Sequence, residues 1–190
     1  MTADFPVVLD ACVLVNQSVT DLLLRLAETP RLYLPFWSDQ ILEETTRTLI
    51  DKLQWPEDLA KYREQQMREH FPEALVHYPK NLLSVLTNDE KDRHVLAAAI
   101  KAKVEVIVTF NVRHFGAEHL APWEIDALDP DKFLISLFDL QPFLVFQRLT
   151  EINQARKIPL RDVLTSLRRT VPRFIDNVKT VFYEKKLGPS

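Results

Sequence analysis

Four polar residues of this chain have the types and positions expected of a site that works on phosphate groups. Asp10 directly follows an apolar run, FPVVL, and Asn111 lies at the end of another, VEVIVTF. Between them, Glu44 and Asp92 lie in segments with helical patterns. Ligands of parallel-sheet proteins bind outside the carboxyl ends of the strands, so a fold can gather all four side chains into one pocket.

Oxygen ligands of this kind indicate a site for Mg²⁺ or Mn²⁺. Mg²⁺ keeps several waters and is typically held by one or two carboxylates together with substrate phosphates. A metal ion in such a pocket neutralises phosphate oxygens, generates hydroxide from bound water and stabilises the leaving oxygen. The pattern therefore predicts an enzyme that cleaves phosphodiesters.

Each candidate also has a simpler structural interpretation. Asp10 can cap a helix that follows the first strand, and Asp92 can complement a helix dipole. Asn111 is a common turn residue. Glu44 can be a solvated surface acid, and its neighbour Glu43 competes with it for the same role. The residues alone leave these alternatives open.

Other kinds of site fit the sequence less well. His94, His114 and Cys12 do not have the spacing of a zinc cluster. Only two glycines occur, Gly116 and Gly188, which excludes the glycine-rich loops that cradle nucleotide phosphates. A phosphotransfer domain of the haloacid-dehalogenase type needs Asp-x-Asp where Cys12 stands, and neither it nor a receiver finds its lysine after an apolar strand.

The elements that must position these residues alternate between strand and helix, which predicts an α/β fold. Its expected form is a three-layer domain with a mostly parallel sheet. Thr87 followed by Glu90 resembles a capping box, so we expect one helix to begin near Asn88 and to include Asp92 in its first or second turn. The predicted strands are 5–9, 31–36, 104–110 and 125–128. The predicted helices are 19–28, one from Ser38 onward, 55–77, 88–101 and 131–140, with further helices after Pro142 that break at Pro159 and Pro172.

Composition is consistent with one domain, or one domain with an appendage. Of the 190 residues, 46% are hydrophobic, which is enough for a core, and the single cysteine excludes an intramolecular disulfide. The N-terminus lacks a basic region followed by a long apolar stretch, and the apolar runs are shorter than the ~20 residues of a membrane span. We therefore expect a cytoplasmic protein with no membrane segment.

Charge divides the chain unevenly. Residues 1–139 contain 14 basic and 23 acidic side chains, and residues 140–190 contain 10 basic and 4 acidic ones. The two parts therefore carry about −9 and +6. An acidic body repels a polyanion unless a metal intervenes, whereas a basic tail attracts a phosphate backbone or an acidic partner. A solvated helical face explains the tail's charge equally well.

Three segments of the sequence together resemble the PIN-domain nucleases of the VapC-like toxin group. The segments are VVLDACVLV, WSDQILEETTRTL and DRHVLAAAIKAKVEVIVTFNVRHF, in the order of that family, and the resemblance covers roughly residues 5–140. It implies a PIN-like α/β/α domain over residues 1–140. It also implies a metal-dependent endoribonuclease that prefers single-stranded RNA and acts as the toxin of a type II toxin-antitoxin pair. The implied partners are a small DNA-binding antitoxin and a second copy in a homodimer.

The resemblance assigns the family's first three acids to Asp10, Glu44 and Asp92. Asp10 and Asp92 are then the main metal ligands, and Glu44 is a ligand or activates the attacking water. The fourth position departs from the family, because Asn111 and His114 stand where an acid is usual. An amide oxygen can ligate a metal but brings no charge, so a second metal should bind more weakly.

Further residues have supporting roles under this resemblance. Thr109 would support the site through its hydroxyl, although β-propensity also explains it. Arg93 and Arg113 would hold RNA phosphates, unless they are solvated or paired with nearby acids.

The basic segment 141–190 resembles a C-terminal helical extension that some members carry. Its apolar stripe would pack on the nuclease domain, on a twin subunit or on an antitoxin. A catalytically weak PIN-like scaffold that binds RNA or protein is the alternative function.

Overall fold

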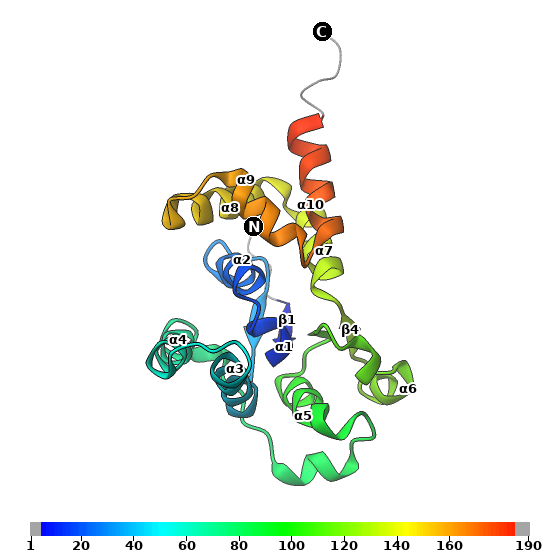
Figure 1. The fold of residues 1–190 in the computed structure, drawn as a ribbon. Helices are drawn as coiled ribbons and strands as arrows, with labels where there is room; N and C mark the ends of the chain where they lie inside the picture. Colours follow the sequence, from blue (N-terminus) through cyan, green and yellow to red (C-terminus); the bar gives the residue numbers. More distant parts are fainter. Residues whose placement is uncertain (1–4, 185–190) are drawn as a thin grey trace.

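A four-stranded parallel sheet lies at the centre of the molecule (Figure 1). The structure is a computed structural model, and it describes residues 5–184. The strand order is β2-β1-β3-β4, and each pair of neighbours is parallel. The strands are β1 (Pro6–Leu9), β2 (Leu34–Phe36), β3 (Val106–Val108) and β4 (Asp126–Leu128). All four lie within the predicted strand segments and are shorter than predicted.

The central strands form because their residues are apolar, largely β-branched and covered on both faces. Val7, Val8 and Leu9 of β1 are fully buried, and so are Ile107 and Val108 of β3. Such continuous apolar runs are typical of parallel strands with helices on both sides. In register, Val8 lies opposite Ile107, so the two strands end level with each other.

Helices cover both faces of the sheet, as the α/β/α prediction requires. In Figure 1, α5 lies on one side of the sheet and α2 and α7 lie on the other. The α-helices are α1 (Ala11–Leu14), α2 (Gln17–Ala27), α3 (Asp39–Asp51), α4 (Glu57–His70), α5 (Arg93–Ala102), α6 (Ala117–Leu120), α7 (Pro130–Leu140), α8 (Pro142–Arg156), α9 (Leu160–Arg168) and α10 (Pro172–Lys179). Short 3₁₀ turns precede α5 at Glu90–Asp92 and follow β3 at Val112–His114. Within residues 5–184, no helix has the length and apolar character that a membrane crossing needs.

The predicted start of α5 was wrong. The Thr87 hydroxyl lies 2.9 Å from Nδ1 of His119 instead of capping a helix. The Asp89 side chain accepts a hydrogen bond from the Lys91 amide, which starts a 3₁₀ turn, and α5 itself begins at Arg93. Asp92 therefore lies at the boundary before α5 and not within its first or second turn.

The C-terminal helices pack on the chain's own body. The predicted breaks at Pro159 and Pro172 are confirmed, since α9 begins after the first proline and α10 begins at the second. The apolar stripe of these helices, including Leu167 and Phe174, is buried in the same core as the strands. Contacts join α8 and α9 to α2, and α10 to α7. The sequence left open whether this stripe packs on the nuclease domain, on a twin subunit or on an antitoxin. In the structure it packs on the chain's own helices.

Candidate active site

Asp10 lies immediately after β1, at the carboxyl edge of the sheet. Its backbone amide donates to the Val108 carbonyl at 3.1 Å, which extends the pairing of β1 with β3 by one residue. Although Asp10 occupies the N-cap position of α1, its side chain makes no capping hydrogen bond. The side chain is nearly fully buried, so its carboxylate lies inside the protein without donating stability to the helix as a cap. The capping interpretation of Asp10 is therefore wrong.

Two donors hold one oxygen of the Asp10 carboxylate. The Thr109 hydroxyl donates to Oδ2 at 2.6 Å, and the Cys12 thiol donates to the same oxygen at 3.0 Å. Burial raises the pKa of Cys12 to about 12, and the neighbouring Asp10 charge adds to the rise, so the thiol keeps its proton and remains a donor. No residue in the described range donates to Oδ1 of Asp10. That oxygen is available to a ligand.

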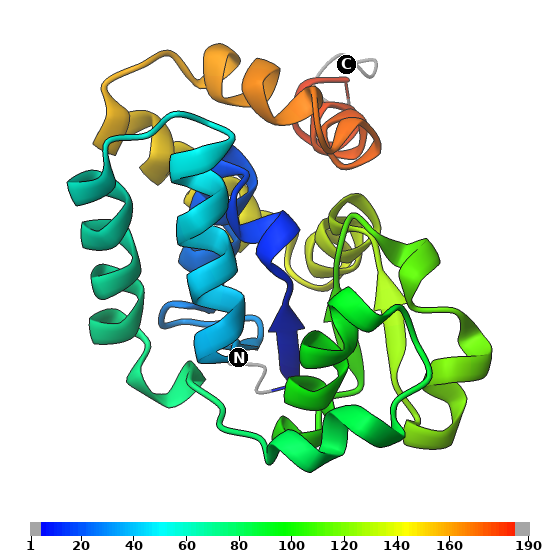
Figure 2. The ribbon, with the colours of Figure 1, turned by 60° about the horizontal axis from the view of Figure 1, so that its bottom comes forward.

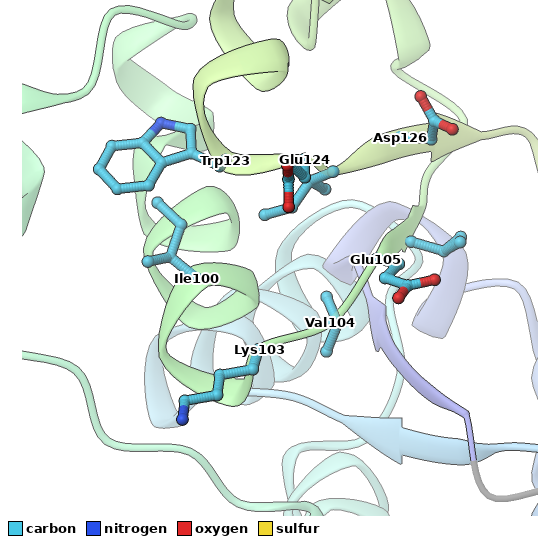
Figure 3. Close-up of a pocket in the computed structure, with 9 residues that line it drawn as sticks. Ile100, Lys103, Val104, Glu105, Trp123, Glu124 and Asp126 are labelled. Atoms are coloured by element: carbon cyan, nitrogen blue, oxygen red, sulfur yellow. The ribbon is translucent and has the colours of Figure 1, made fainter.

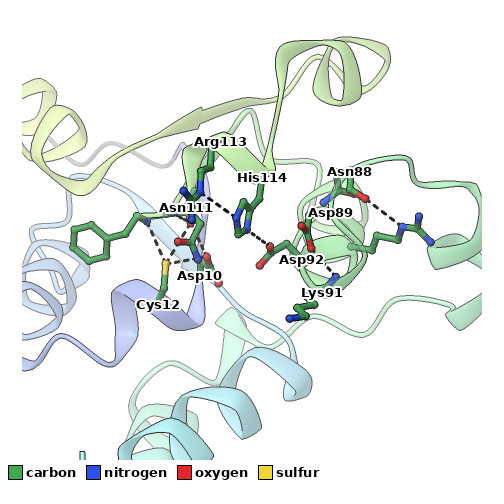
Figure 4. A network of polar contacts seen from close by, with 12 residues as sticks. Asp10, Cys12, Asn88, Asp89, Lys91, Asp92, Asn111, Arg113 and His114 are labelled. Atoms are coloured by element: carbon green, nitrogen blue, oxygen red, sulfur yellow. Dashed lines mark hydrogen bonds and ion pairs between the residues drawn. The ribbon is translucent and has the colours of Figure 1, made fainter. Parts of the chain in front are cut away.

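Asp92 reaches the same edge from the other side of the site (Figure 4). It is buried, and its side chain does not cap α5. Instead, Oδ2 lies 2.7 Å from Nδ1 of His114, which belongs to the turn after β3. The Arg113 Nε donates to Nε2 of the same ring at 3.3 Å, so we assign the ring proton to Nδ1. His114 therefore orients the Asp92 carboxylate by donating from Nδ1.

Asp92 lies among other negative charges. Burial raises the pKa of Asp92, and the charges of Asp10 and Asp89 raise it further, while the hydrogen bond from His114 opposes the rise. Negative groups that disfavour one another's ionised form are typical of a site that a cation completes.

Asp89 is a further member of the group that sequence reasoning did not single out. One ligand atom each from Asp89, Asp92 and His114 lies within 4.8 Å of the others. Asp89 is exposed and lies in the loop before α5, three residues before Asp92. The only feature of the sequence that pointed to Asp89 was its position three residues before Asp92. The predicted capping box hid this feature, because it placed residue 89 in a helix instead of a loop.

Glu44 lies on α3 and faces α5, whereas Glu43 points elsewhere. Oε2 of Glu44 is 3.3 Å from Nε2 of His94, a distance suited to charge attraction, although the alignment is not that of a hydrogen bond. The adjacent His94 lowers the pKa of the Glu44 carboxyl. Glu43 lines a separate groove with Ser38 and Tyr78. Of the two neighbouring acids, Glu44 is thus the one beside α5, the helix that Asp92 immediately precedes.

Three further predicted residues, Asn111, Arg113 and Arg93, lie around the site in different settings. The backbone amide of Asn111 donates to the Thr109 hydroxyl at 2.9 Å, and its side chain does not cap the turn that follows. Arg113 is exposed and contacts His114, as described above. Nε of Arg93 donates to the Asn88 carbonyl at 3.3 Å, which ties that arginine to the loop before α5.

A separate cavity of about 510 Å³ lies at the other end of the strands (Figure 3). Its lining comes from the end of α5 and from the residues around the beginnings of β3 and β4, including Lys103, Trp123 and Asp126. None of the predicted catalytic residues lines it. It is therefore distinct from the carboxyl edge, where Asp10 and Asp92 lie.

The donor set at the carboxyl edge fits a hard divalent cation. Carboxylate oxygens suit Mg²⁺ and Mn²⁺, whereas an imidazole suits zinc and later transition metals. Both nitrogens of His114 are already engaged, by Asp92 and Arg113, so the ring positions a ligand and is not assigned as one. The carboxylates of Asp89 and Asp92 are close enough to share one ion, and the free Oδ1 of Asp10 lies at the same edge of the sheet.

Comparison with known proteins gives an independent view of the chain. The family model described as PIN domain matches residues 6–113, which is more than half of the chain. A relative from Mycobacterium tuberculosis (strain ATCC 25618 / H37Rv), described as "Putative ribonuclease VapC50", is 50% identical over 60 residues. That match covers 32% of this chain and 36% of the relative, so the two are alike over about a third of their lengths. No solved structure matches the chain significantly.

The family match contains the segments that carry the site. Asp10, Glu44, Asp92 and Asn111 all lie between residues 6 and 113, whereas His114 lies one position beyond. The sheet, the covering helices and the acids at the carboxyl edge agree with the resemblance seen in the sequence. The chain belongs to the PIN domain family.

Proposed function

We propose that this chain is a divalent-metal-dependent endoribonuclease. The observation that carries the proposal is that two largely buried acids, Asp10 and Asp92, lie at the same edge of the sheet although 82 residues separate them. Neither carboxylate caps a helix or pairs with a lysine or arginine within residues 5–184. Buried acids without a permanent cationic partner are costly unless a cation binds.

The protein's own residues have distinct roles in this proposal. A bound Mg²⁺ or Mn²⁺ would supply charge neutralisation and water activation for phosphodiester cleavage. Asp10 and Asp92 hold the ion, and Thr109 and His114 fix the orientation of these two carboxylates. Glu44, which keeps a lowered pKa, holds the ion or accepts the proton of the attacking water.

Three further residues face the substrate under this proposal. Asn111 offers an amide oxygen where relatives usually have an acid, which favours one tightly bound metal over two. Arg113 and Arg93 contact the phosphates on either side of the cut. The exposure of Arg113 supports that role more strongly than the position of Arg93, which is tied to the Asn88 carbonyl.

The proposed substrate is single-stranded RNA, and the proposed setting is a type II toxin-antitoxin pair. The ribonuclease description of the mycobacterial relative supports the activity, and its VapC name supports the toxin assignment. We accordingly propose a small DNA-binding antitoxin as partner, a homodimer as the assembly and the cytoplasm as the place of action. Residues 1–140 would form the nuclease unit and residues 141–190 its basic extension.

Purified Asp10→Asn beside the wild type tests this function directly. Both proteins, free of antitoxin, are incubated with single-stranded RNA in Mg²⁺, in Mn²⁺ and in EDTA. Wild-type cleavage that needs the metal and is lost in Asp10→Asn is the expected result. Thermal melting of both proteins controls for folding, and equal cleavage by both would overturn the assignment.

A catalytically weak scaffold is the second candidate, because Asn111 and His114 replace acids at the fourth position. Such a protein would bind RNA without metal-dependent cleavage. Titration with Mn²⁺ separates the two functions. Affinity that survives the loss of both Asp10 and Asp92 would favour the scaffold, and affinity that disappears with them supports the nuclease.

A further inference from the structure

The catalytic edge of the sheet continues from Asp10 to the end of β4. The Asp10 amide donates to the Val108 carbonyl, and the Thr109 amide donates to the Leu128 carbonyl at 2.9 Å. Asp10, Thr109 and Asp129 therefore follow three neighbouring strands at the same level. Neighbouring strands lie about 4.8 Å apart, which places the backbone of Asp129 about 10 Å from that of Asp10.

The C-terminal extension is attached to both ends of this edge. At one end, the Asn16 side chain, just after α1, donates to the Thr170 hydroxyl at 3.2 Å. At the other end, Nη2 of Arg173 lies 3.6 Å from Asp129, and its Nε donates to Asp131 at 3.0 Å. The segment between α9 and α10 thus spans from the loop between α1 and α2 to the residue that follows β4. In Figure 2 the arrowhead of β1 points toward the end of the molecule where α9 and α10 lie.

Three arginines occur along this crossing segment, and all three are exposed. Arg173 keeps 60% of its side chain exposed despite its two acidic neighbours. In the described part of the chain, Arg168 pairs only with the equally exposed Asp176. Arg169 has no acidic partner among residues 5–184 and lies at the surface. We call residues 168–173 the arginine segment.

We propose that the arginine segment binds the phosphates of the same RNA strand that is cut at Asp10 and Asp92, and this inference rests on the proposed function. The body of the protein is acidic, so a strand that approaches the carboxylates needs positive charge nearby. Arg173 supplies that charge at the end of β4, and the exposed Arg169 lies four residues before it in the same segment. The planar guanidinium offers several donors at once to a phosphate, and Arg173 keeps donors beyond those that its acids use.

An acidic protein partner could also be drawn to exposed arginines, but the location favours RNA. Arg173 contacts Asp129, whose backbone lies about 10 Å from Asp10 by strand spacing, which is within reach of a neighbouring nucleotide of the strand being cut. A partner that used the same arginines would compete with RNA, and the test below distinguishes the two.

Charge-removing variants with a matched control test the arginine segment. Arg169→Gln and Arg173→Gln remove one charge each at the catalytic edge. The Asp131 anchor survives Arg173→Gln, because the backbone amides of residues 173 and 174 also donate to it. The control is Arg161→Gln, which is 85% exposed near the other end of α9, about 12 Å away by helix rise.

RNA binding is measured without cleavage, by fluorescence anisotropy of a labelled single-stranded RNA with the full chain in EDTA at several salt concentrations. We expect each of the two variants to bind about fivefold more weakly and to lower the salt slope by about 0.7. Arg161→Gln should bind like the wild type. In the presence of metal, the two variants should raise KM and leave kcat nearly unchanged.

Each outcome bears on the inference separately from the proposed function. Wild-type cleavage with unchanged RNA affinity and unchanged KM in Arg169→Gln and Arg173→Gln would overturn the inference and leave the nuclease intact. Equal weakening by Arg161→Gln would also overturn it, because unspecific charge would then explain binding. RNA binding that depends on the two arginines in a protein that does not cut would support the inference and overturn the nuclease. Variants that bind RNA normally but lose an acidic protein partner would assign the segment to that partner.

Discussion

The Thr109 hydroxyl donates to the Asp10 carboxylate at 2.6 Å, across 99 residues of sequence. The same hydroxyl accepts from the Asn111 amide, so one side chain joins the ends of β1 and β3 and positions the residue that follows. The Cys12 thiol adds a second donor to the same oxygen of Asp10. The carboxylate is thereby fixed in one orientation with its other oxygen free.

Thr109→Val should weaken metal binding while it preserves the shape of the strand end. Loss of the hydroxyl removes the donor that orients Asp10, and changes of this kind cost about 10-fold to 100-fold in metal affinity or activity. Calorimetric titration with Mn²⁺ measures the affinity. Thr109→Ser, which keeps the hydroxyl, is the matched control and should stay close to wild type.

Glu44→Gln and Glu43→Gln form a matched pair on one helix. Glu44 lies beside His94 and α5, whereas Glu43 lines another groove. We expect Glu44→Gln to reduce RNA cleavage about a hundredfold or more, as the loss of a catalytic base or ligand does. Glu43→Gln should remain within about twofold of wild type, since a solvated surface acid contributes little. The opposite ranking of the two variants would exclude Glu44 from the site.

His114→Asp should restore the acid that is usual in relatives. A further close carboxylate strengthens the binding of Mg²⁺, by about tenfold, because hard cations prefer charged oxygen ligands. The same charge repels Asp92 and Asp89 when no metal is bound, so the melting temperature in EDTA should fall. His114→Asn, which adds no charge, is the control for both measurements. A melting temperature in EDTA that rises in His114→Asp would contradict this account.

The pair of Arg148 and Glu151 on α8 predicts a pH dependence of stability away from the site. Burial of Glu151 raises its pKa, but hydrogen bonds from Arg148 and Gln147 outweigh burial and leave the pKa below its usual range. A carboxyl group whose pKa is lower in the folded protein than in the unfolded chain stabilises the fold at pH values above the unfolded pKa. That contribution is lost as the pH falls through the pKa of the folded protein. Glu151→Gln should therefore cost at most about 1 kcal/mol at pH 7. The cost should begin to shrink as the pH drops below the ordinary glutamate pKa of about 4.3, and it should vanish once the pH is below the lowered pKa of Glu151 in the folded protein. Urea unfolding at several pH values measures it.

Asp131→Asn should loosen the C-terminal extension. The buried Asp131 accepts from the backbone amides of Arg173 and Phe174 and from the Arg173 side chain. An amide cannot accept all three bonds, so we expect a loss of about 2 to 3 kcal/mol in the free energy of unfolding. Limited proteolysis near the start of α10 should become faster. Asp176→Asn removes only an exposed pair with Arg168 and should cost less than about 0.5 kcal/mol.

The strands and the parallel sheet were predictable from the sequence because short apolar, β-branched runs determine them locally. Val106–Val108 is an example, since nothing else in the segment competes with strand formation. The start of α5 was not predictable in the same way. Thr87 has the residue type of a cap, but a contact with His119, 32 residues away, takes its hydroxyl. Long-range contacts of this kind are invisible in a local pattern.

The same difference between local patterns and long-range contacts applies to the candidate site residues. The motif order predicted that Asp10 and Asp92 act together. In the structure both lie at the carboxyl edge of the sheet, and the charge of Asp10 raises the pKa of Asp92. The role of His114 was missed, because sequence reasoning treated it as a lost acid and not as a donor to Asp92. Asp89 was missed because its side chain joins the group only through the 3₁₀ turn that follows it.

The pairing of β1 with β3 also determines when the site can form during folding. β1 is made near the start of the chain, yet the partner that holds Asp10 is synthesised about a hundred residues later. Closing a loop of that length costs about 4 kcal/mol from its length alone, and such long-range pairing is slow. A nascent chain that has not yet completed β3 carries Asp10 without its orienting hydroxyl. The candidate site at the carboxyl edge therefore forms only after more than half of the chain has been synthesised.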